Sequence, residues 1–213
     1  DRYPDLYVSN LGSKNRLYHN RGDGTFEDVA AKAGVELPLN AFASWFWDYD
    51  GNGNLDLYST SYDQGDPMAG LRLAPVVQSF LGLPHDAELG RLYRGNGRGN
   101  FENVSEQVNL RRLTLPMGAN FGDLDNDGFL DFYLGTGYPH YDGAIPNVMY
   151  WNRGGKKFLD VSTAGGFALL AKGHGVSFAD LDDDGDQDVF EQMGGAYPGD
   201  PFVNVLFQNP GFG

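Results

Sequence analysis

The sequence predicts an all-β fold, a β-propeller segment built of four-stranded antiparallel blades, and three observations predict it. An aspartate-rich loop of nine residues occurs three times in the same register. A glycine-bearing turn accompanies each loop, and the phenylalanine after the turn precedes the next loop by 22 residues every time. The segments between these motifs are short, mostly alternating and rich in aromatic or β-branched residues, as strands are. A β-sandwich is the structural rival, but it does not require such in-register repetition.

Each repeat reads in chain order as strand, aspartate loop, strand, variable linker, strand, glycine turn, strand. The strands predicted after the three loops are LDLYST, LDFYLGT and QDVFEQM. The glycine turns lie in LYHNRGDGTFEDV (17–29), LYRGNGRGNFENV (92–104) and MYWNRGGKKFLDV (149–161), and LFQNPGFG begins a fourth. We therefore expect a single propeller segment over 1–213, with repeat units of approximately 1–47, 48–122, 123–179 and 180–213. About three and a half blades are present, so a partial ring or a fragment is expected.

The three loops are DYDGNGNLD (48–56), DLDNDGFLD (123–131) and DLDDDGDQD (180–188). Oxygen-bearing side chains at alternate positions suit calcium, a hard cation that takes six to eight oxygen ligands, and glycine allows the loop to turn sharply around it. Acidic hairpin turns are the alternative, because Asp, Asn and Gly are common turn residues. Three copies in register, each with carboxylates that repel one another, favour calcium.

The predicted ligands are the side chains at loop positions one, three, five and nine, with the backbone carbonyl of position seven. They are Asp48, Asp50, Asn52, Asp56 and the carbonyl of Asn54 in the first loop; Asp123, Asp125, Asp127, Asp131 and the carbonyl of Phe129 in the second; and Asp180, Asp182, Asp184, Asp188 and the carbonyl of Asp186 in the third. A fourth, partial calcium site is expected at the N-terminus, where Asp1 and Asp5 match loop positions five and nine but Arg2 replaces the glycine.

The third loop also fits the EF-hand expression, because Glu191 stands at its twelfth position. Ser59 and Leu134 stand there in the other loops, and neither can clamp calcium. The segments that follow the loops read as strands, so we expect the loops to be hairpin connections.

The loops and the NxGDGTFxDV-like turns together resemble the FG-GAP or VCBS repeats of integrin-type β-propellers. Within that group, NRGDGTFEDVAAKAGV followed by an aspartate loop and LDLY is similar to bacterial members of the ASPIC/UnbV and cartilage acidic protein group. The resemblance covers nearly the whole chain and implies that calcium is structural, held by the ligands named above. The sequence departs from the pattern at Arg2 and in the insertion at 61–90 of the second unit.

The formal net charge is -14, and 13 of the 29 acidic residues lie within the three loops. Three calcium ions would add six positive charges, and the remaining excess argues against nucleic acid and anionic membranes as partners. No apolar run is long enough to span a bilayer. Loops of this kind fill best where calcium is near millimolar, so we expect an extracellular, periplasmic or cell-surface setting.

In an antiparallel meander, the aspartate loops and the glycine turns share one end of each sheet, and the variable linkers occupy the other. Binding is expected at the linker end. Within the 61–90 insertion, apolar residues at helical spacing from Leu73 to Leu81 predict a short helix with Pro75 in its first turn. This helix either docks a partner or caps a pocket, or it packs on its own blade. Tyr138 and Tyr197, each followed by proline, are candidates either to bind sugar or protein or to stiffen a turn.

No catalytic or organic-cofactor residue is predicted, because the four histidines are scattered and no nucleophile elbow, phosphate loop or zinc signature occurs. The expected function is a calcium-binding scaffold for protein interaction or adhesion, whose partners are other proteins or the remainder of the propeller. The alternative is a polysaccharide-acting enzyme or a sugar-binding module, with carbohydrate bound on the face opposite the calcium loops.

Overall fold

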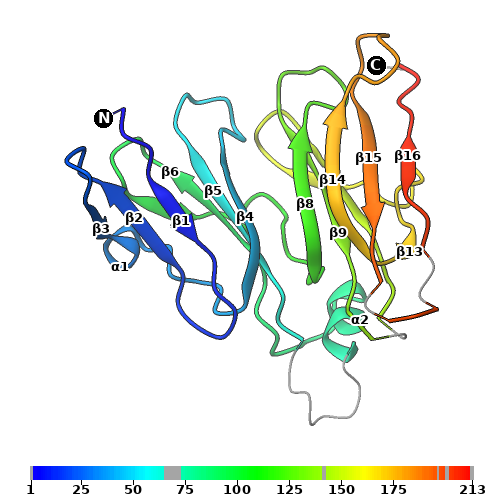
Figure 1. The fold of residues 1–213 in the computed structure, drawn as a ribbon, viewed down its shortest axis with the longest axis horizontal. Coiled ribbons are helices and arrows are strands. Elements are labelled where there is room, and N and C mark those ends of the chain that lie inside the picture. Colours follow the sequence, from blue (N-terminus) through cyan, green and yellow to red (C-terminus); the bar gives the residue numbers. More distant parts are fainter. Residues whose placement is uncertain (1, 65–72, 141–142, 196, 200–201, 212–213) are drawn as a thin grey trace. The chain divides into compact units, whose positions relative to one another are not determined.

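The computed structural model describes residues 2–64, 73–140, 143–195, 197–199 and 202–211 (Figure 1). These residues form five antiparallel sheets and two short helices, which confirms the predicted all-β class and the partial propeller. The chain divides into two compact units, one made of 1–48 and 52–113 and the other of 49–51 and 114–213.

Unit 1 contains two sheets whose strands lie side by side in chain order. The first sheet is β1 (Leu6–Val8), β2 (Arg16–Asn20) and β3 (Phe26–Asp28), followed by the helix α1 (Ala30–Ala33). The second is β4 (Ala41–Trp47), β5 (Asp56–Ser61), β6 (Arg91–Gly95) and β7 (Phe101–Asn103), with the helix α2 (Ala74–Phe80) between β5 and β6. One buried hydrophobic cluster of the unit contains Leu17, Leu57 and Tyr93 together with Val35 and the two buried alanines of α1.

Unit 2 repeats this plan. One sheet pairs β8 (Pro116–Gly122), β9 (Asp131–Thr136), β11 (Val148–Asn152) and β12 (Phe158–Asp160). A second sheet is β14 (Gly173–Ala179), β15 (Asp188–Met193) and β16 (Val205–Phe207), and β10 (Ile145–Pro146) pairs with β13 (Leu170–Ala171) in a small ladder. The core contains Tyr133, Met149, Val176 and Val189.

Each aspartate loop joins the first two strands of a blade-like sheet, as predicted. Trp47 pairs with Asp56, Gly122 with Asp131 and Ala179 with Asp188 at the closing rung of each hairpin. The glycine turns join the next pair of strands, so both motifs lie at the same end of each sheet. In unit 2 of Figure 1, this end is the one where the β14–β15 hairpin and the segment after β16 lie.

Glycine permits close contact between the two large sheets of unit 2. A Cβ atom on Gly118 of β8 would fall 1.2 Å from the carbonyl oxygen of His174 on β14. Backbone cannot yield to such a contact, so a side chain at this position would push β8 and β14 apart.

The predicted helix of the insertion is α2, and Pro75 lies in its first turn as expected. Val76 is buried, and the Leu113 N–H donates to the Ser79 hydroxyl at 2.8 Å, so the helix is anchored on its own unit. Four apolar side chains remain more than half exposed, namely Val77, Phe80, Leu81 and Leu83. The side of α2 that carries Val76 packs on its own unit, while Val77 and Phe80 face solvent.

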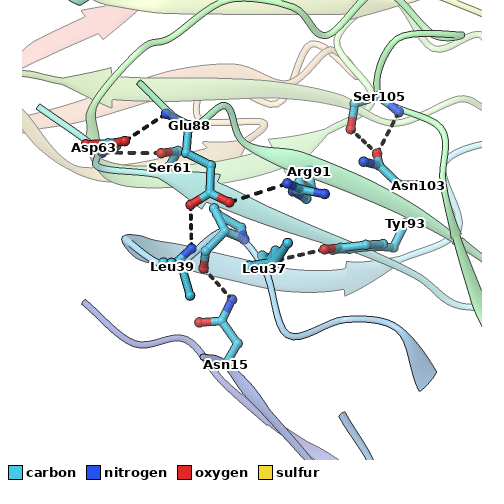
Figure 2. Close-up of polar contacts among 11 residues, drawn as sticks. Asn15, Leu37, Leu39, Ser61, Asp63, Glu88, Arg91, Tyr93, Asn103 and Ser105 are labelled. Atoms are coloured by element: carbon cyan, nitrogen blue, oxygen red, sulfur yellow. Dashed lines mark hydrogen bonds and ion pairs between the residues drawn. The ribbon is translucent and has the colours of Figure 1, made fainter. Parts of the chain in front are cut away.

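Glu88 ties the end of the insertion to the segment between α1 and β4 (Figure 2). The Glu88 carboxylate accepts from the Leu39 N–H at 2.6 Å and pairs with Arg91 at 3.3 Å, while its N–H donates to Asp63 at 2.7 Å. Nearby, the Tyr93 hydroxyl donates to the Leu37 carbonyl at 2.8 Å. These bonds join the segments at the linker end of the unit to one another.

Glu191 is fully buried on β15 and lies apart from the loop whose twelfth position it fills. Its carboxylate accepts from the Tyr133 hydroxyl at 2.9 Å and from the Asn147 amide at 2.7 and 2.8 Å. Burial raises the pKa of Glu191 to about 7, and these two hydrogen bonds oppose the rise. Glu191 is thus a core residue, which agrees with the hairpin interpretation over the EF-hand.

Because the folded-state pKa of Glu191 is about 7 and its ordinary value is 4.5, the unfolded chain loses this proton first as pH rises. The contribution to stability is therefore present below about pH 4.5 and is lost as pH rises through 7, by up to about 3 kcal/mol. We expect the unfolding free energy of Glu191→Gln, from denaturant titrations at constant calcium, to fall less steeply over this range than that of the native chain. Glu106→Gln, at an exposed position, should keep the native slope. Parallel slopes for the native chain and Glu191→Gln would contradict the assignment.

Candidate metal centres

The three aspartate loops share one backbone conformation. Position six is a left-handed glycine in each, with φ of 83° at Gly53, 88° at Gly128 and 96° at Gly185. Position four is also left-handed, and it is occupied by Gly51, Asn126 and Asp183, with φ of 68°, 56° and 61°. Glycine, asparagine and aspartate are the residues that adopt this conformation at least cost. A left-handed residue at position four was not predicted from the sequence, although Gly, Asn and Asp are the residue types that indicate one.

The first aspartate of each loop closes the turn. In the second loop, the Asp123 carboxylate accepts from the N–H groups of Asp127 at 3.1 Å and Gly128 at 3.0 Å. Asp48 and Asp180 make the same two contacts in their own loops, at distances of 2.8 to 3.1 Å. Hydrogen bonds to the carboxylate of its own first aspartate therefore stabilise each loop conformation.

The third position provides the clearest indication of a cation. Asp50 Oδ1 and Asp125 Oδ1 are both buried and have no hydrogen-bond donor among the described residues. The other oxygen of Asp125 accepts from the Trp151 indole at 2.7 Å, which orients the carboxylate. In the third loop, Asp182 is exposed and accepts from the Gln208 amide. A buried carboxylate oxygen without a donor is costly unless a cation occupies its open side.

The ninth aspartate joins its loop to the neighbouring glycine turn. Asp131 accepts from the N–H groups of Leu124 at 2.9 Å and Asn152 at 2.7 Å, and it is fully buried. Burial raises the pKa of Asp131 to about 7, the two backbone N–H groups lower it, and the charges of Asp125 and Asp123 raise it further. A divalent cation among these carboxylates would favour the ionised form. Asp188 and Asp56 make the corresponding contacts with the N–H groups of Asn209 and Gly95, both at 2.8 Å.

Three acidic side chains of each loop offer oxygens that all lie within 4.8 Å of one another. The groups are Asp48, Asp50 and Asp56; Asp123, Asp125 and Asp131; and Asp180, Asp182 and Asp184. These three groups could hold metal ions, and clustered carboxylates with nearby carbonyls suit a hard cation such as calcium. Asp127 and Asp188 lie outside the groups. At position five, Asn52, Asp127 and Asp184 accept from the position-seven N–H groups of Asn54, Phe129 and Asp186, at 2.8 to 3.0 Å.

The N-terminal partial loop is represented by Asp5, since Asp1 lies outside the described residues. The Asp5 carboxylate accepts from the Asn20 N–H at 2.9 Å and pairs with His19 at 3.1 Å. Its contact with Asn20 is the one that Asp131 and Asp188 make with their glycine turns. Asp5 therefore takes the place of a ninth-position aspartate, as the sequence alignment of the repeats predicts.

The described residues of unit 1 include two hollows. The larger, of about 810 Å³, is at the aspartate-loop end, beside Asp5, Leu55 and the glycine turn that includes Arg98. The smaller, of about 380 Å³, is lined by 9–11 and 41–43. In unit 1, the more spacious of the two hollows therefore lies at the end opposite the linkers, where binding was not expected.

At the linker end of unit 2, the two predicted tyrosines belong to one aromatic group. The Tyr138 ring stacks on His140 with a centroid distance of 5.1 Å and an interplanar angle of 9°. His140 meets Tyr197 edge to face at 6.2 Å, and Tyr197 is 42% exposed. Residues 59 positions apart are thus brought together, a proximity that the sequence did not predict.

A family profile for the FG-GAP-like repeat matches residues 1–59, 80–134 and 138–191. The chain belongs to this family. Each matched stretch contains one glycine turn and one complete aspartate loop, and most of the insertion falls outside them. Among the described residues of this FG-GAP-like repeat protein, neither helix has the length and apolar character needed to cross a membrane.

The chain is also similar to cartilage acidic protein 1 from three organisms. It is 26% identical to the Homo sapiens protein, 25% to that of Mus musculus and 23% to that of Xenopus tropicalis, in each case over 171 residues. The alignments cover 62% of this chain and 26% of each relative, so the chain corresponds to about a quarter of those proteins.

The bonds of Asp131 predict a structural role that does not depend on an ion. Asp131→Ala leaves two N–H groups without their acceptor, and we expect it to lower the unfolding free energy by about 2–4 kcal/mol in excess chelator. Asp127→Ala is the control, because that exposed carboxylate accepts from a single N–H, and a loss below about 1 kcal/mol is expected. Equal losses in denaturant titrations of the two variants would contradict the role assigned to Asp131.

Proposed function

We propose that the chain is a calcium-binding β-propeller segment that serves as an extracellular or cell-surface scaffold for protein interaction or adhesion. In this proposal 1–213 forms a single segment of repeated blades, and calcium is structural. The ligands are those predicted at positions one, three, five, seven and nine of each loop. The partners are other proteins or the remainder of the propeller.

The observation that carries the calcium proposal is the pair of buried, donor-free oxygens on Asp50 and Asp125. Hydrogen bonds from N–H groups already satisfy the first and ninth aspartates of the second loop, so the open oxygen of Asp125 is the one that needs a cation. Its neighbours within 4.8 Å are further carboxylate oxygens. An anionic oxygen cluster without cysteine or histidine favours calcium over zinc or copper.

The calcium affinity expected of such loops and the matched relatives support the proposed extracellular or cell-surface setting. Loops of flexible oxygen ligands are filled at calcium concentrations near millimolar, which occur outside cells. The matched relatives are named cartilage acidic protein, and the present chain is also acidic, with a net charge of -14. With three calcium ions bound, the remaining charge of -8 would keep nucleic acid and anionic membranes away.

The scaffold role rests on apolar and aromatic side chains that the fold leaves in solvent at α2 and near Tyr197. Interfaces between proteins are enriched in aromatic residues, and their fully buried cores are more apolar than the rest of the protein surface. Hydrogen bonds such as those of Glu88 connect segments of unit 1 near its linkers, and a surface ordered in advance in this way would lose less conformational freedom on binding.

We expect calcium to raise the melting temperature of the chain, whereas magnesium, which prefers a smaller octahedral shell, should raise it much less. A hundredfold excess of calcium over the dissociation constant stabilises by about 2.7 kcal/mol per site. Thermal unfolding in calcium, in magnesium and in excess chelator measures this difference. Asp50→Asn combined with Asp125→Asn should remove most of the calcium-specific shift. Equal shifts with both cations, or none with calcium, would refute the proposal.

Carbohydrate binding, with or without catalysis, is the second candidate, and the aromatic group of Tyr138, His140 and Tyr197 favours it. Exposed aromatic rings supply flat apolar faces for sugar rings. We expect Tyr197→Ala to weaken binding to a panel of neutral and acidic oligosaccharides about tenfold. Tyr3→Ala is the control, because Tyr3 is 52% exposed and packs near Gly22 at the other end of its unit. Absence of oligosaccharide binding by the native chain, or an equal effect of Tyr3→Ala, would exclude this candidate.

A further inference from the structure

The second and third aspartate loops are joined directly by hydrogen bonds. The Asn126 side-chain amide, at position four of the second loop, donates to the Gly185 carbonyl at 3.3 Å and to Asp186 Oδ1 at 2.5 Å. In the other direction, the Gln187 side-chain oxygen accepts from the Asp123 N–H at 3.0 Å. The side chains of Asn126 and Gln187 therefore each form a hydrogen bond with the other loop.

A third amide, Asn209, contacts both loops from the glycine turn after β16. Its side-chain N–H groups donate to the Leu124 carbonyl at 2.8 Å and to the Gln187 carbonyl at 3.3 Å. Its backbone N–H donates to Asp188 at 2.8 Å. One side chain is thus bonded to backbone of the second loop and of the third.

These bonds end on, or next to, the groups proposed to bind calcium. Leu124 lies between the ligands Asp123 and Asp125, and the Asp123 N–H belongs to a ligand itself. In the third loop, Asp186 provides a proposed carbonyl ligand and Gln187 precedes Asp188. The hydrogen bonds therefore connect the two loops at atoms that neighbour the proposed ligands of both.

We propose that Asn126, Gln187 and Asn209 couple the second and third calcium sites, so that an ion in one loop raises the affinity of the other. The inference rests on the proposed calcium function. Each ion has to order a loop, and a loop already held by its occupied neighbour costs less to order. Repulsion between the two ions acts in the opposite sense, and the measured coupling is the net of both effects. Coupling is reciprocal, so each site must change the affinity of the other by the same factor.

The other repeats supply an internal comparison. Asn152 has the position of Asn209 and donates to the Tyr49 carbonyl of the first loop at 2.8 Å and the Leu130 carbonyl of the second at 3.1 Å. At position four, however, the first loop has Gly51 where the second has Asn126. At position eight, the second loop has Leu130 where the third has Gln187. Neither glycine nor leucine has a side-chain amide. The sequence therefore offers the full set of amides only between the second and third sites.

This comparison provides variants that keep the loop conformation. Asn126→Gly installs the residue of the first loop and tolerates the left-handed backbone, and Gln187→Leu installs the residue of the second loop. Asn20→Gly is the matched control, since Gly95 occupies that place in the second repeat and the Asn20 side-chain amide donates to Pro4 of the partial loop.

The experiment is isothermal calorimetric titration of the full chain with calcium, in an Asp50→Asn background that removes the first site. Asp182→Asn with Asp184→Asn then removes the third site and spares Asp180, which closes its loop. We expect loss of the third site to weaken the second site about fivefold or more. In Asn126→Gly with Gln187→Leu, the second site should have the same affinity whether or not the third is present. The Asn20→Gly control should retain the coupling.

The outcomes separate the inference from the function on which it rests. Two calcium sites that bind independently in the Asp50→Asn background would overturn the coupling and leave the calcium proposal intact. Coupling of undiminished size in Asn126→Gly with Gln187→Leu would overturn the role of the amides, and Gln187→Leu alone, which leaves the left-handed residue in place, gives the same test if the double variant does not fold. Absence of calcium binding in the native chain would overturn both.

Discussion

The carboxylate at the ninth position of each aspartate loop is the contact on which the rest of the structure depends. In the second loop, the Asp131 carboxylate accepts hydrogen bonds from the N–H of Leu124, at the start of its own loop, and from the N–H of Asn152 in the neighbouring glycine turn. A single buried side chain thus joins two hairpins that are separate in sequence. The same contact recurs at Asp5, Asp56 and Asp188, which explains why the two motifs occur together in each repeat.

That arrangement concentrates negative charge where the fold can least accommodate it. Burying Asp131 raises its pKa to about 7, and Asp125 Oδ1 is buried without a donor. A cation at the loop relieves both costs, because it compensates the carboxylates for lost hydration. Folding and calcium binding would then be one process in these loops, with the hydrogen bonds of Asp123 shaping the site in advance.

The linker end follows a different physical rule. The Glu88 carboxylate accepts from the Leu39 N–H and pairs with Arg91, and Glu191 accepts from a tyrosine and an asparagine, so neither acid requires an ion. Hydrogen bonds and an ion pair stabilise this end. Because the repeated ligand sets lie at the opposite end, the repeats can differ here, as they do at α2 and at the aromatic group around Tyr197. The molecule therefore separates a repeated, charged end from a variable one where recognition is proposed.

The sequence by itself determined the repeat, the strand order and the loops, because Asp-x-Asp spacing, left-handed glycine and alternating strands are local properties. It also placed α2, whose spacing and Pro75 are local signals. Only the tertiary structure decided that Asp125 keeps an open oxygen, that Glu191 is a core residue, and that Tyr138 and Tyr197 share one aromatic group. It alone showed Asn126 and Asn209 reaching the neighbouring loop, because burial and cross-repeat distance arise when sheets pack and have no signature in a single stretch of sequence.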